Sequence, residues 1–135
     1  MHQFVSNKFI DKHGMSYSIF SAVQKLIKKT KLPNPYLLID GNYNFKKHQL
    51  ENKFPFSYKS IIKGDSKVAS IAAASIIAKV KRDRYMNSVS AKFPGYGFEG
   101  HKGYGTAFHI TKIKELGYTP IHRMSFQLKA GAHGI

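Results

Sequence analysis

Apolar residues along the chain follow two spacings, one typical of helices and one typical of buried strands. Residues 16–29 carry apolar side chains at every third or fourth position, between Gly14 and a proline-rich stop, and this predicts an amphipathic helix. Residues 36–39 form a short apolar run that suits a buried strand, and a second strand is predicted near residues 57–62. The polar and aromatic residues 43–56 between them show no period and are expected to form a loop.

Two further helices are predicted in the second half of the chain. One begins at Asp65 or Ser66 and is expected to reach about Ala91. The other begins at a Thr106 cap and ends at Gly117. Strands alternating with helices indicate the α/β class. The expected apolar face of the longer helix includes Val68, Ile71, Ala74, Ala78 and Met86.

Length and composition indicate one ordinary folded domain. The chain has 135 residues, of which 42% are apolar, so we expect a single domain over residues 1–128 with a loose tail at 129–135. Cysteine is absent, which fits a reducing compartment, and we expect a cytoplasmic protein. The longest uncharged run, between Lys67 and Lys79, is much shorter than the roughly 20 apolar residues of a membrane span. No membrane association is therefore expected.

The charge balance is strongly basic. A formal net charge of +15 favours polyanionic partners, because neutralising phosphates supplies salt-sensitive affinity. Nucleic acid is the leading candidate. The alternative is that lysine is spread over the whole surface and no polyanion binds.

Only seven acidic residues are present, and two of them stand at informative positions. Asp40 and Asp65 both follow predicted strands, where open α/β sheets place their ligand crevice. Carboxylates at neighbouring strand ends suit divalent ions such as Mg²⁺ facing a phosphate backbone. The plainer alternative is that Asp40 begins a turn and Asp65 caps a helix.

A glycine-rich run at residues 96–106 combines flexible backbone, aromatic rings and cations. Tyr104 could stack on a base or sugar, and Lys102 could meet a phosphate. The alternative is a structural loop whose aromatic side chains pack inward. A zinc site is rejected, because His101 and the histidines after it have no accompanying cysteine or His-Glu-x-x-His unit.

Six segments, in this order and spacing, together resemble bacterial ribonuclease HII over about residues 11–126. They are Asp40-Gly41-Asn42, Lys63-Gly64-Asp65-Ser66, Ala73-Ala74-Ser75-Ile76-Ile77-Ala78-Lys79-Val80-Lys81-Arg82-Asp83, Phe93-Pro94-Gly95-Tyr96-Gly97-Phe98, His101-Lys102-Gly103-Tyr104 and Ile121-His122-Arg123-Met124-Ser125-Phe126.

The resemblance implies a ribonuclease H-like fold and metal-dependent cleavage of nucleic acid. The substrates it implies are the RNA strand of RNA–DNA hybrids and single ribonucleotides embedded in duplex DNA, cut on the 5′ side of the ribonucleotide. By the same match, Asp40 and Asp65 are two of four acids that hold Mg²⁺ or Mn²⁺. Tyr104 matches the residue that packs on the sugar at the RNA–DNA junction, with Lys102 and His101 beside it as substrate contacts.

The sequence departs from the family in one important respect. The family carries an Asp-Glu pair in an Asp-Glu-x-Gly-Arg-Gly segment on its first strand, and this chain has no such segment. We therefore expect a partial fold without the first three strands, and a chain that by itself is weakly stable and inactive. Its predicted first strand should have an unpaired edge and an uncovered apolar surface. The alternative function is a non-catalytic basic module that binds hybrid or duplex nucleic acid.

Overall fold

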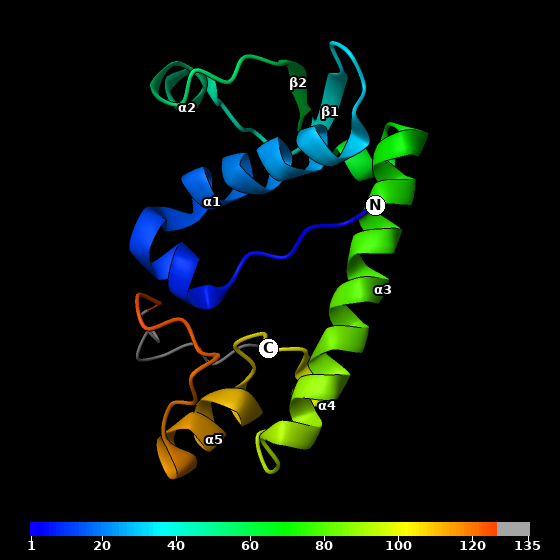
Figure 1. Ribbon diagram of the computed structural model, residues 1–135. Helices are drawn as coiled ribbons and strands as arrows, with labels where there is room; N and C mark the ends of the chain where they lie inside the picture. The colour runs from blue at the N-terminus through cyan, green and yellow to red at the C-terminus, as the bar shows by residue number, and fades with distance from the viewer. Residues whose placement is uncertain (127–135) are drawn as a thin grey trace. The chain divides into compact units, whose positions relative to one another are not determined.

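The computed structural model describes residues 1–126, and the predicted loose tail at 129–135 lies outside the described residues. Helices and strands alternate along the described part of the chain, which confirms the α/β prediction (Figure 1). In chain order the elements are α1 (Asn7–Thr30), β1 (Tyr36–Asp40), α2 (Lys46–Glu51), β2 (Ser57–Ile61), the 3₁₀ turn η1 (Gly64–Ser66), α3 (Ala69–Lys92), α4 (Phe98–His101) and α5 (Ala107–Leu116).

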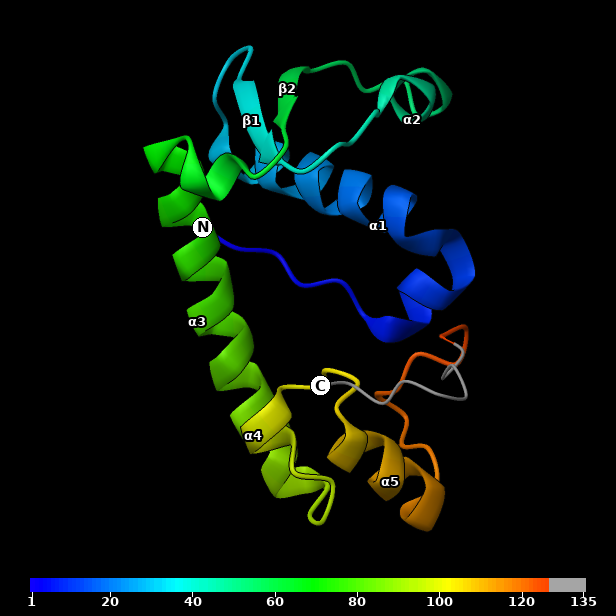
Figure 2. The ribbon, with the colours of Figure 1, turned by 180° about the vertical axis from the view of Figure 1, so that it is seen from behind.

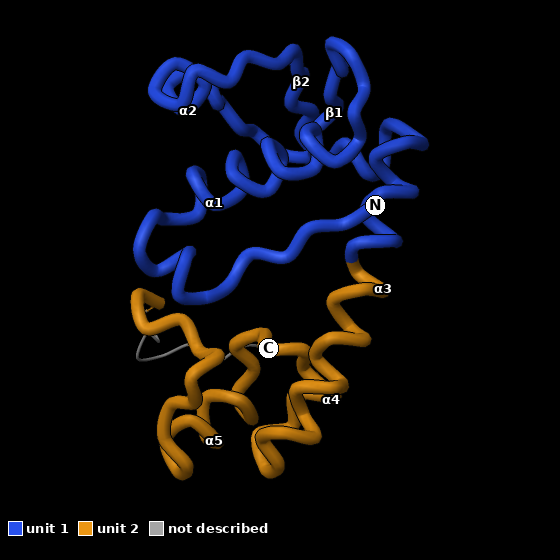
Figure 3. The backbone as a smooth tube through the Cα atoms, in the orientation of Figure 1, with its two compact units in different colours: residues 1–78 blue, residues 79–135 orange. Residues whose placement is uncertain are grey.

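The chain divides into two compact units (Figure 3). Unit 1 comprises residues 1–78 and holds α1, both strands, α2, η1 and the first part of α3. Unit 2 begins at Lys79 and holds the rest of α3 with α4 and α5.

The two strands pair in parallel and form the sheet of unit 1. Tyr36 lies opposite Ser57 at one end of the register, and Asp40 lies opposite Ile61 at the other. Both strands form where the apolar pattern predicted them. Because the pairing is parallel, the carboxyl ends of β1 and β2 lie at the same edge of the sheet.

Helix α1 is longer than predicted. It begins at Asn7, after Ser6, whose hydroxyl accepts a hydrogen bond from the Phe9 amide at 3.2 Å. Gly14 interrupts the helix with φ 77° and ψ 167°, a conformation that side-chain-bearing residues rarely adopt. Helical residues before Gly14 were not predicted, because a capped segment of two turns is too short to show a clear period.

The segment expected to be a loop between the strands contains the short helix α2, so that prediction was wrong. Its six residues are too few for an apolar period, and packing against α1 supports the helix. Ser16 Oγ of α1 lies 3.1 Å from His48 Nε2 of α2. The Tyr17 hydroxyl donates to Asn52 Oδ1 at 3.1 Å. Figures 1 and 2, seen from opposite sides, both show α1 alongside the strands and α2.

Aromatic rings form the core of unit 1. Phe20 of α1 and Phe45, just before α2, are both fully buried, and their ring centroids are 5.9 Å apart. Phe56 stacks on Phe20 at 6.0 Å, and Tyr58 of β2 lies 5.4 Å from Phe45. The Tyr58 hydroxyl also accepts a hydrogen bond from the Phe45 amide at 2.7 Å. This cluster fixes the segment between the two strands.

Helix α3 begins later and is less covered than predicted. Asp65 and Ser66 belong to the 3₁₀ turn, and α3 starts only at Ala69. Ile71 and Met86 are buried as expected, each 5% exposed, but Ala74 and Ala78 are exposed because the described residues place no element over that part of the helix.

Several large apolar side chains of unit 1 and α3 are exposed, which confirms the predicted uncovered apolar surface. Tyr36 and Leu38 of β1 are 63% and 40% exposed, and Ile76 of α3 is 65% exposed. Within the described residues, β1 pairs with β2 alone. The described helices include none with the length and apolar character that a membrane crossing requires.

Unit 2 is built around the end of α3 and helix α5. Thr106 caps α5 as predicted, accepting a hydrogen bond from the His109 amide at 3.2 Å, and Gly117 follows the helix with φ 82°. The glycine-rich run, in which the sequence indicated flexible backbone, contains the short helix α4. The core of the unit consists of Met86, Val89, Tyr96 and Phe98, with Phe93 and Ile121 packed against it.

Candidate active site

The end of β1 brings the Asp40 carboxylate to the start of η1. Asp40 Oδ1 accepts a hydrogen bond from the Gly64 amide at 2.7 Å. The ladder continues one step beyond the strands, because the Gly41 amide donates to the Ile61 carbonyl at 3.0 Å. The parallel register therefore brings the Asp40 carboxylate to Gly64, the residue directly before Asp65 in the chain.

Gly64 makes this approach possible. It is buried, and a Cβ built on it would lie 2.7 Å from Ile71 Cδ1 and 3.4 Å from Asp40 Oδ1. Any side chain at this position would therefore push against the first turn of α3 and approach the carboxylate. The glycine allows the backbone amide to meet Asp40 directly.

Asp40 and Asp65 offer oxygen ligands that suit a hard divalent cation. Both residues are exposed to solvent, and the amide of Gly64 occupies Oδ1 of Asp40, which leaves Oδ2 to face a ligand. A magnesium ion is commonly bound by one or two carboxylates and several waters, so this pair fits part of such a site. Residues 1–126 contain no group of three or more histidines, cysteines or acids that could hold a metal ion.

Tyr104 presents its ring to solvent in unit 2. The side chain is 68% exposed and follows α4 in the glycine-rich run. The guanidinium carbon of Arg82, from α3, lies 5.9 Å from the ring centroid, and Arg82 Nη2 donates to the Lys102 carbonyl at 3.0 Å. Arg82 therefore holds the backbone before Tyr104 and places a positive charge beside its ring. The ring remains open to stacking.

Lys102 and His101 are both bound to neighbouring groups. The Lys102 ammonium donates to Asn87 Oδ1 and to the Glu99 carbonyl. His101 uses both ring nitrogens on the backbone, Nε2 with the Tyr96 carbonyl at 2.7 Å and Nδ1 with the Gly103 amide at 3.1 Å. Contact with a phosphate would therefore require Lys102 to give up its present hydrogen-bond partners. His101 instead links the backbone of Tyr96 to that of Gly103.

The carboxylate of Glu99 adds a negative charge next to these cations. The Ser90 hydroxyl donates a hydrogen bond to Glu99, and this bond lowers the pKa of the Glu99 carboxyl. The positive charge of Lys102 acts in the same direction. Glu99 is thus ionised at neutral pH.

Two buried histidines lie next to the Tyr104 backbone. His109 and His122 are 5% and 9% exposed, and their Nε2 atoms are 3.0 Å apart. Burial lowers the pKa of both imidazoles below the usual value of 6.5. Both rings are therefore neutral at neutral pH.

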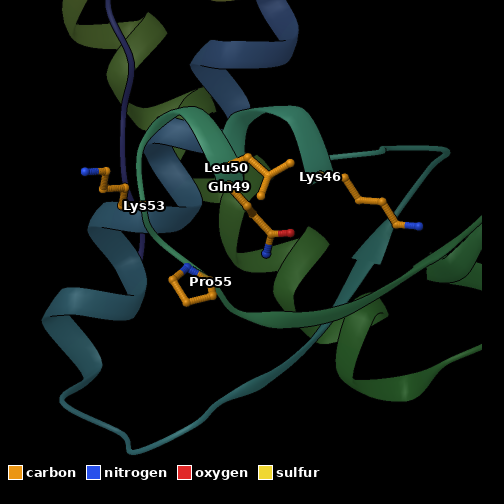
Figure 4. A pocket seen from close by; sticks show the side chains of 5 residues that line it. All are labelled: Lys46, Gln49, Leu50, Lys53 and Pro55. Carbon is orange, nitrogen blue, oxygen red and sulfur yellow. The ribbon is translucent and has the colours of Figure 1, made fainter.

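A shallow pocket lies elsewhere in unit 1, on α2 and the residues that follow it (Figure 4). Its volume is about 570 Å³. Neither Asp40 nor Asp65 contributes to its walls. The lining residues are Lys46, Gln49, Leu50, Lys53 and Pro55.

The structure brings the sequence-predicted residues together in two sets. Asp40 and Asp65 belong to unit 1, whereas His101, Lys102 and Tyr104 belong to unit 2. Sequence reasoning did not find the role of Arg82, because a cation one helix away has no fixed spacing from the aromatic ring it contacts. It also passed over the buried histidine pair, for which the only sequence signal was a histidine in each of two neighbouring apolar segments.

Comparison with known proteins identifies the family. The family model described as Ribonuclease HII matches residues 1–129. A protein named Ribonuclease HII from Aliarcobacter butzleri is 43% identical over 127 residues, covering 94% of this chain and 62% of that protein. Proteins of the same name from Chloroherpeton thalassium and Caldicellulosiruptor bescii are 41% identical over 124 residues and 43% identical over 122 residues. The matches cover 92% and 90% of this chain, and 58% and 56% of those proteins.

This chain therefore spans about three fifths of the length of the curated relatives it matches. The resemblance inferred from the six sequence segments is confirmed, and the two parallel strands with packed helices are consistent with part of a ribonuclease H-like fold. The chain belongs to the ribonuclease HII family.

Proposed function

We propose that this chain carries part of the active site of a metal-dependent endoribonuclease. The substrates are the RNA strand of RNA–DNA hybrids and single ribonucleotides within duplex DNA, cut on the 5′ side of the ribonucleotide. Family membership supports the reaction class. The residue assignment rests on the 2.7 Å hydrogen bond from the Gly64 amide to Asp40 Oδ1. This bond holds the Asp40 carboxylate against the residue that directly precedes Asp65.

Asp40 and Asp65 are the residues of this chain that would hold the divalent ion, Mg²⁺ or Mn²⁺. A bound ion would supply Lewis-acid stabilisation of charge on the phosphate. The bond from Gly64 orients the Asp40 carboxylate, so that Oδ2 is presented to a ligand. The family's Asp-Glu pair, absent from this sequence, supplies the other two acids expected by resemblance.

Tyr104 is proposed to contact the sugar at the RNA–DNA junction, with Lys102 and His101 as further substrate contacts. Its exposed ring and the cation beside it suit a nucleic acid strand. The net charge of +15 favours approach of the polyanion, a contribution that does not depend on sequence.

The ligand assignment is tested in a chimera in which a first strand bearing an Asp-Glu-x-Gly-Arg-Gly segment is joined to this chain. Asp40→Asn and Asp65→Asn should each lower Mg²⁺-dependent cleavage of a duplex with one ribonucleotide by about 100-fold or more, because losing even an outer-shell partner costs 10- to 100-fold. Glu115→Gln, an exposed ion-pair residue on α5, is the control and should cleave normally. If the Asp variants cut as well as the control, the assignment is wrong.

The same chimera tests the sugar contact. Tyr104→Ala should reduce cleavage at an isolated ribonucleotide more than it reduces binding to all-DNA duplex, since stacking on a ring is worth about 1–3 kcal/mol. Tyr104→Phe keeps the ring and should behave like the parent. Equal losses in cleavage and DNA binding would refute the sugar contact.

A further inference from the structure

Two histidine rings of unit 2, His101 and His109, bind the backbone at Gly103 and Tyr104, and a third, His122, binds His109. The Gly103 amide donates to His101 Nδ1 at 3.1 Å, so Nδ1 is an acceptor and the proton of the neutral ring is on Nε2. That proton is donated to the Tyr96 carbonyl at 2.7 Å. His101 thus joins the start of the glycine-rich run to the residue before Tyr104, and its tautomer is fixed by the backbone.

The other two rings form a chain of hydrogen bonds with one possible direction. His109 Nδ1 lies 2.9 Å from the Tyr104 carbonyl, which can only accept, so Nδ1 carries the proton. At the other end, the Thr119 amide donates to His122 Nδ1 at 2.8 Å, so in the neutral ring the proton is on Nε2. His122 Nε2 therefore donates across 3.0 Å to His109 Nε2. The Thr119 amide and the Tyr104 carbonyl together fix opposite tautomers in the two rings.

An additional proton would break bonds of this chain. A proton added to His109 would set two N–H groups face to face across the 3.0 Å gap to His122. A proton added to His122 Nδ1 would oppose the Thr119 amide and leave only the Thr119 hydroxyl, 2.8 Å away, to accept it. His101 stacks on His109 with ring centroids 4.2 Å apart, so a charge on either ring would also repel a charge on the other.

We infer that His109 and His122 are positioning residues that hold the backbone of Tyr104, as neutral rings in opposite tautomers, and so present its exposed ring to nucleic acid. The part played by nucleic acid rests on the proposed function, whereas the hydrogen-bond chain stands on the geometry alone. Tyr104 has a second backbone restraint on the same oxygen, because the Thr106 amide donates to it at 2.8 Å. The histidine pair and the cap of α5 therefore act on one carbonyl.

The groups around the pair are few enough to separate in a titration. The rings of Tyr96 and Tyr118 face His122, with ring centroids 5.7 and 5.5 Å from that of the imidazole. Other charged or titratable groups in contact with the three histidines or adjacent to them in sequence are Glu99, Lys102 and Arg123. Of these, Glu99 stays ionised at neutral pH, whereas burial lowers the pKa values of His109 and His122.

The first experiment measures the tautomers in the full chain, labelled with ¹⁵N, by long-range ¹H–¹⁵N correlation of the imidazole rings at pH 7.5. The expected result is an Nδ1–H tautomer for His109 and Nε2–H tautomers for His122 and His101. The same tautomer in His109 and His122, or rapid averaging in either, would overturn the inference. No substitution is needed, so this measurement does not depend on a variant's folding.

The second experiment separates the two bonds of His109 with a matched pair of variants. His109→Gln can keep an acceptor for His122 but loses the donor to Tyr104, whereas His109→Asn can keep that donor and loses the acceptor. Hydrogen exchange of the Tyr104 and Thr106 amides should accelerate about fivefold in the Gln variant, the effect of losing one net hydrogen bond, and less than twofold in the Asn variant. The Gly117 amide, bonded to the Ile113 carbonyl at 2.9 Å, is the control and should not change.

Equal acceleration in both variants would show that His109 acts only by packing, and would refute the positioning role. In both variants His122 should keep its Nε2–H tautomer, because the Thr119 amide still donates to Nδ1. Neither readout requires cleavage. A failure of this inference therefore leaves the nuclease proposal untouched, and a failure of the nuclease proposal leaves the tautomers to be measured.

Discussion

Gly64→Ala tests how closely the chain is packed where it brings the two aspartates near each other. The added Cβ would lie 2.7 Å from Ile71 Cδ1, well inside the 3.5–4.0 Å at which carbon atoms attract. It would also lie 3.4 Å from Asp40 Oδ1 and from Ile61 Cβ. Ile71 is 5% exposed, so its side chain has little room to turn away. Gly64 does not have a positive φ, so the cost is steric rather than conformational.

The expected loss of stability is about 1–3 kcal/mol, the usual cost of an added methyl group in a packed interior. With a urea m-value of about 2 kcal/mol/M, a loss of 2 kcal/mol lowers the unfolding midpoint by about 1 M. Urea unfolding followed by circular dichroism measures this shift. Gly100→Ala is the control, because a Cβ there meets nothing within 4 Å and the glycine lies in helix α4. It should be neutral or stabilise by up to about 1 kcal/mol.

A second substitution identifies the clashing atom. Ile71→Val removes Cδ1 itself and should cost about 0.5–1.5 kcal/mol alone. Combined with Gly64→Ala, it should relieve the clash, so the double variant should lose less than the sum of the single losses by about 0.5–3 kcal/mol. Strictly additive losses, or an unchanged midpoint for Gly64→Ala, would refute the packing argument.

Three further predictions follow from unit 2 and from the charge. Tyr96→Phe should cost about 0.5–1.5 kcal/mol in urea unfolding, because the hydroxyl of this buried residue shares its one proton between two carbonyls at the end of α5, whereas Tyr118→Phe, at an exposed ring, should cost almost nothing. Stability should be full above about pH 6.5 and fall as the pH drops below it, since the pKa values of His109 and His122 are lowered in the folded state and the unfolded chain takes up protons first. Thermal unfolding between pH 8 and 5 measures this, and a flat profile contradicts it. Binding to duplex nucleic acid, measured by fluorescence anisotropy, should weaken steeply with added salt, with a log–log slope of about −0.9 per phosphate contact; no salt dependence would argue against a polyanion.

Short sequence patterns correctly predicted the helices and strands that are marked by an apolar run, a cap residue or a stop residue close by in the chain. The apolar run at residues 36–39 became β1, and the Thr106 cap and Gly117 stop bounded α5. Helix α2 was missed because contacts from α1, such as that of Ser16 with His48, support six residues that have no period of their own. The exposure of Ala74 also could not be read from spacing, which predicts a helix face but not what covers it.

For the site, the sequence by itself determined that Asp40 and Asp65 follow two short strands in a basic chain, and that the motifs around them belong to the ribonuclease HII family. Their roles as metal ligands stay a prediction. Sequence order alone could not give the bond from the Gly64 amide to Asp40, because the bond joins residues 24 positions apart and depends on the parallel register of β1 and β2.

The tertiary structure also decided what the histidines do. In the sequence, His109 and His122 are two histidines with no metal-binding pattern, whereas in the fold they share one proton across 3.0 Å. Their tautomers follow from an amide at one end and a carbonyl at the other. Hydrogen bonds have direction and short range, so such a network exists only when packing has brought its members together, and no local pattern of residues can specify it.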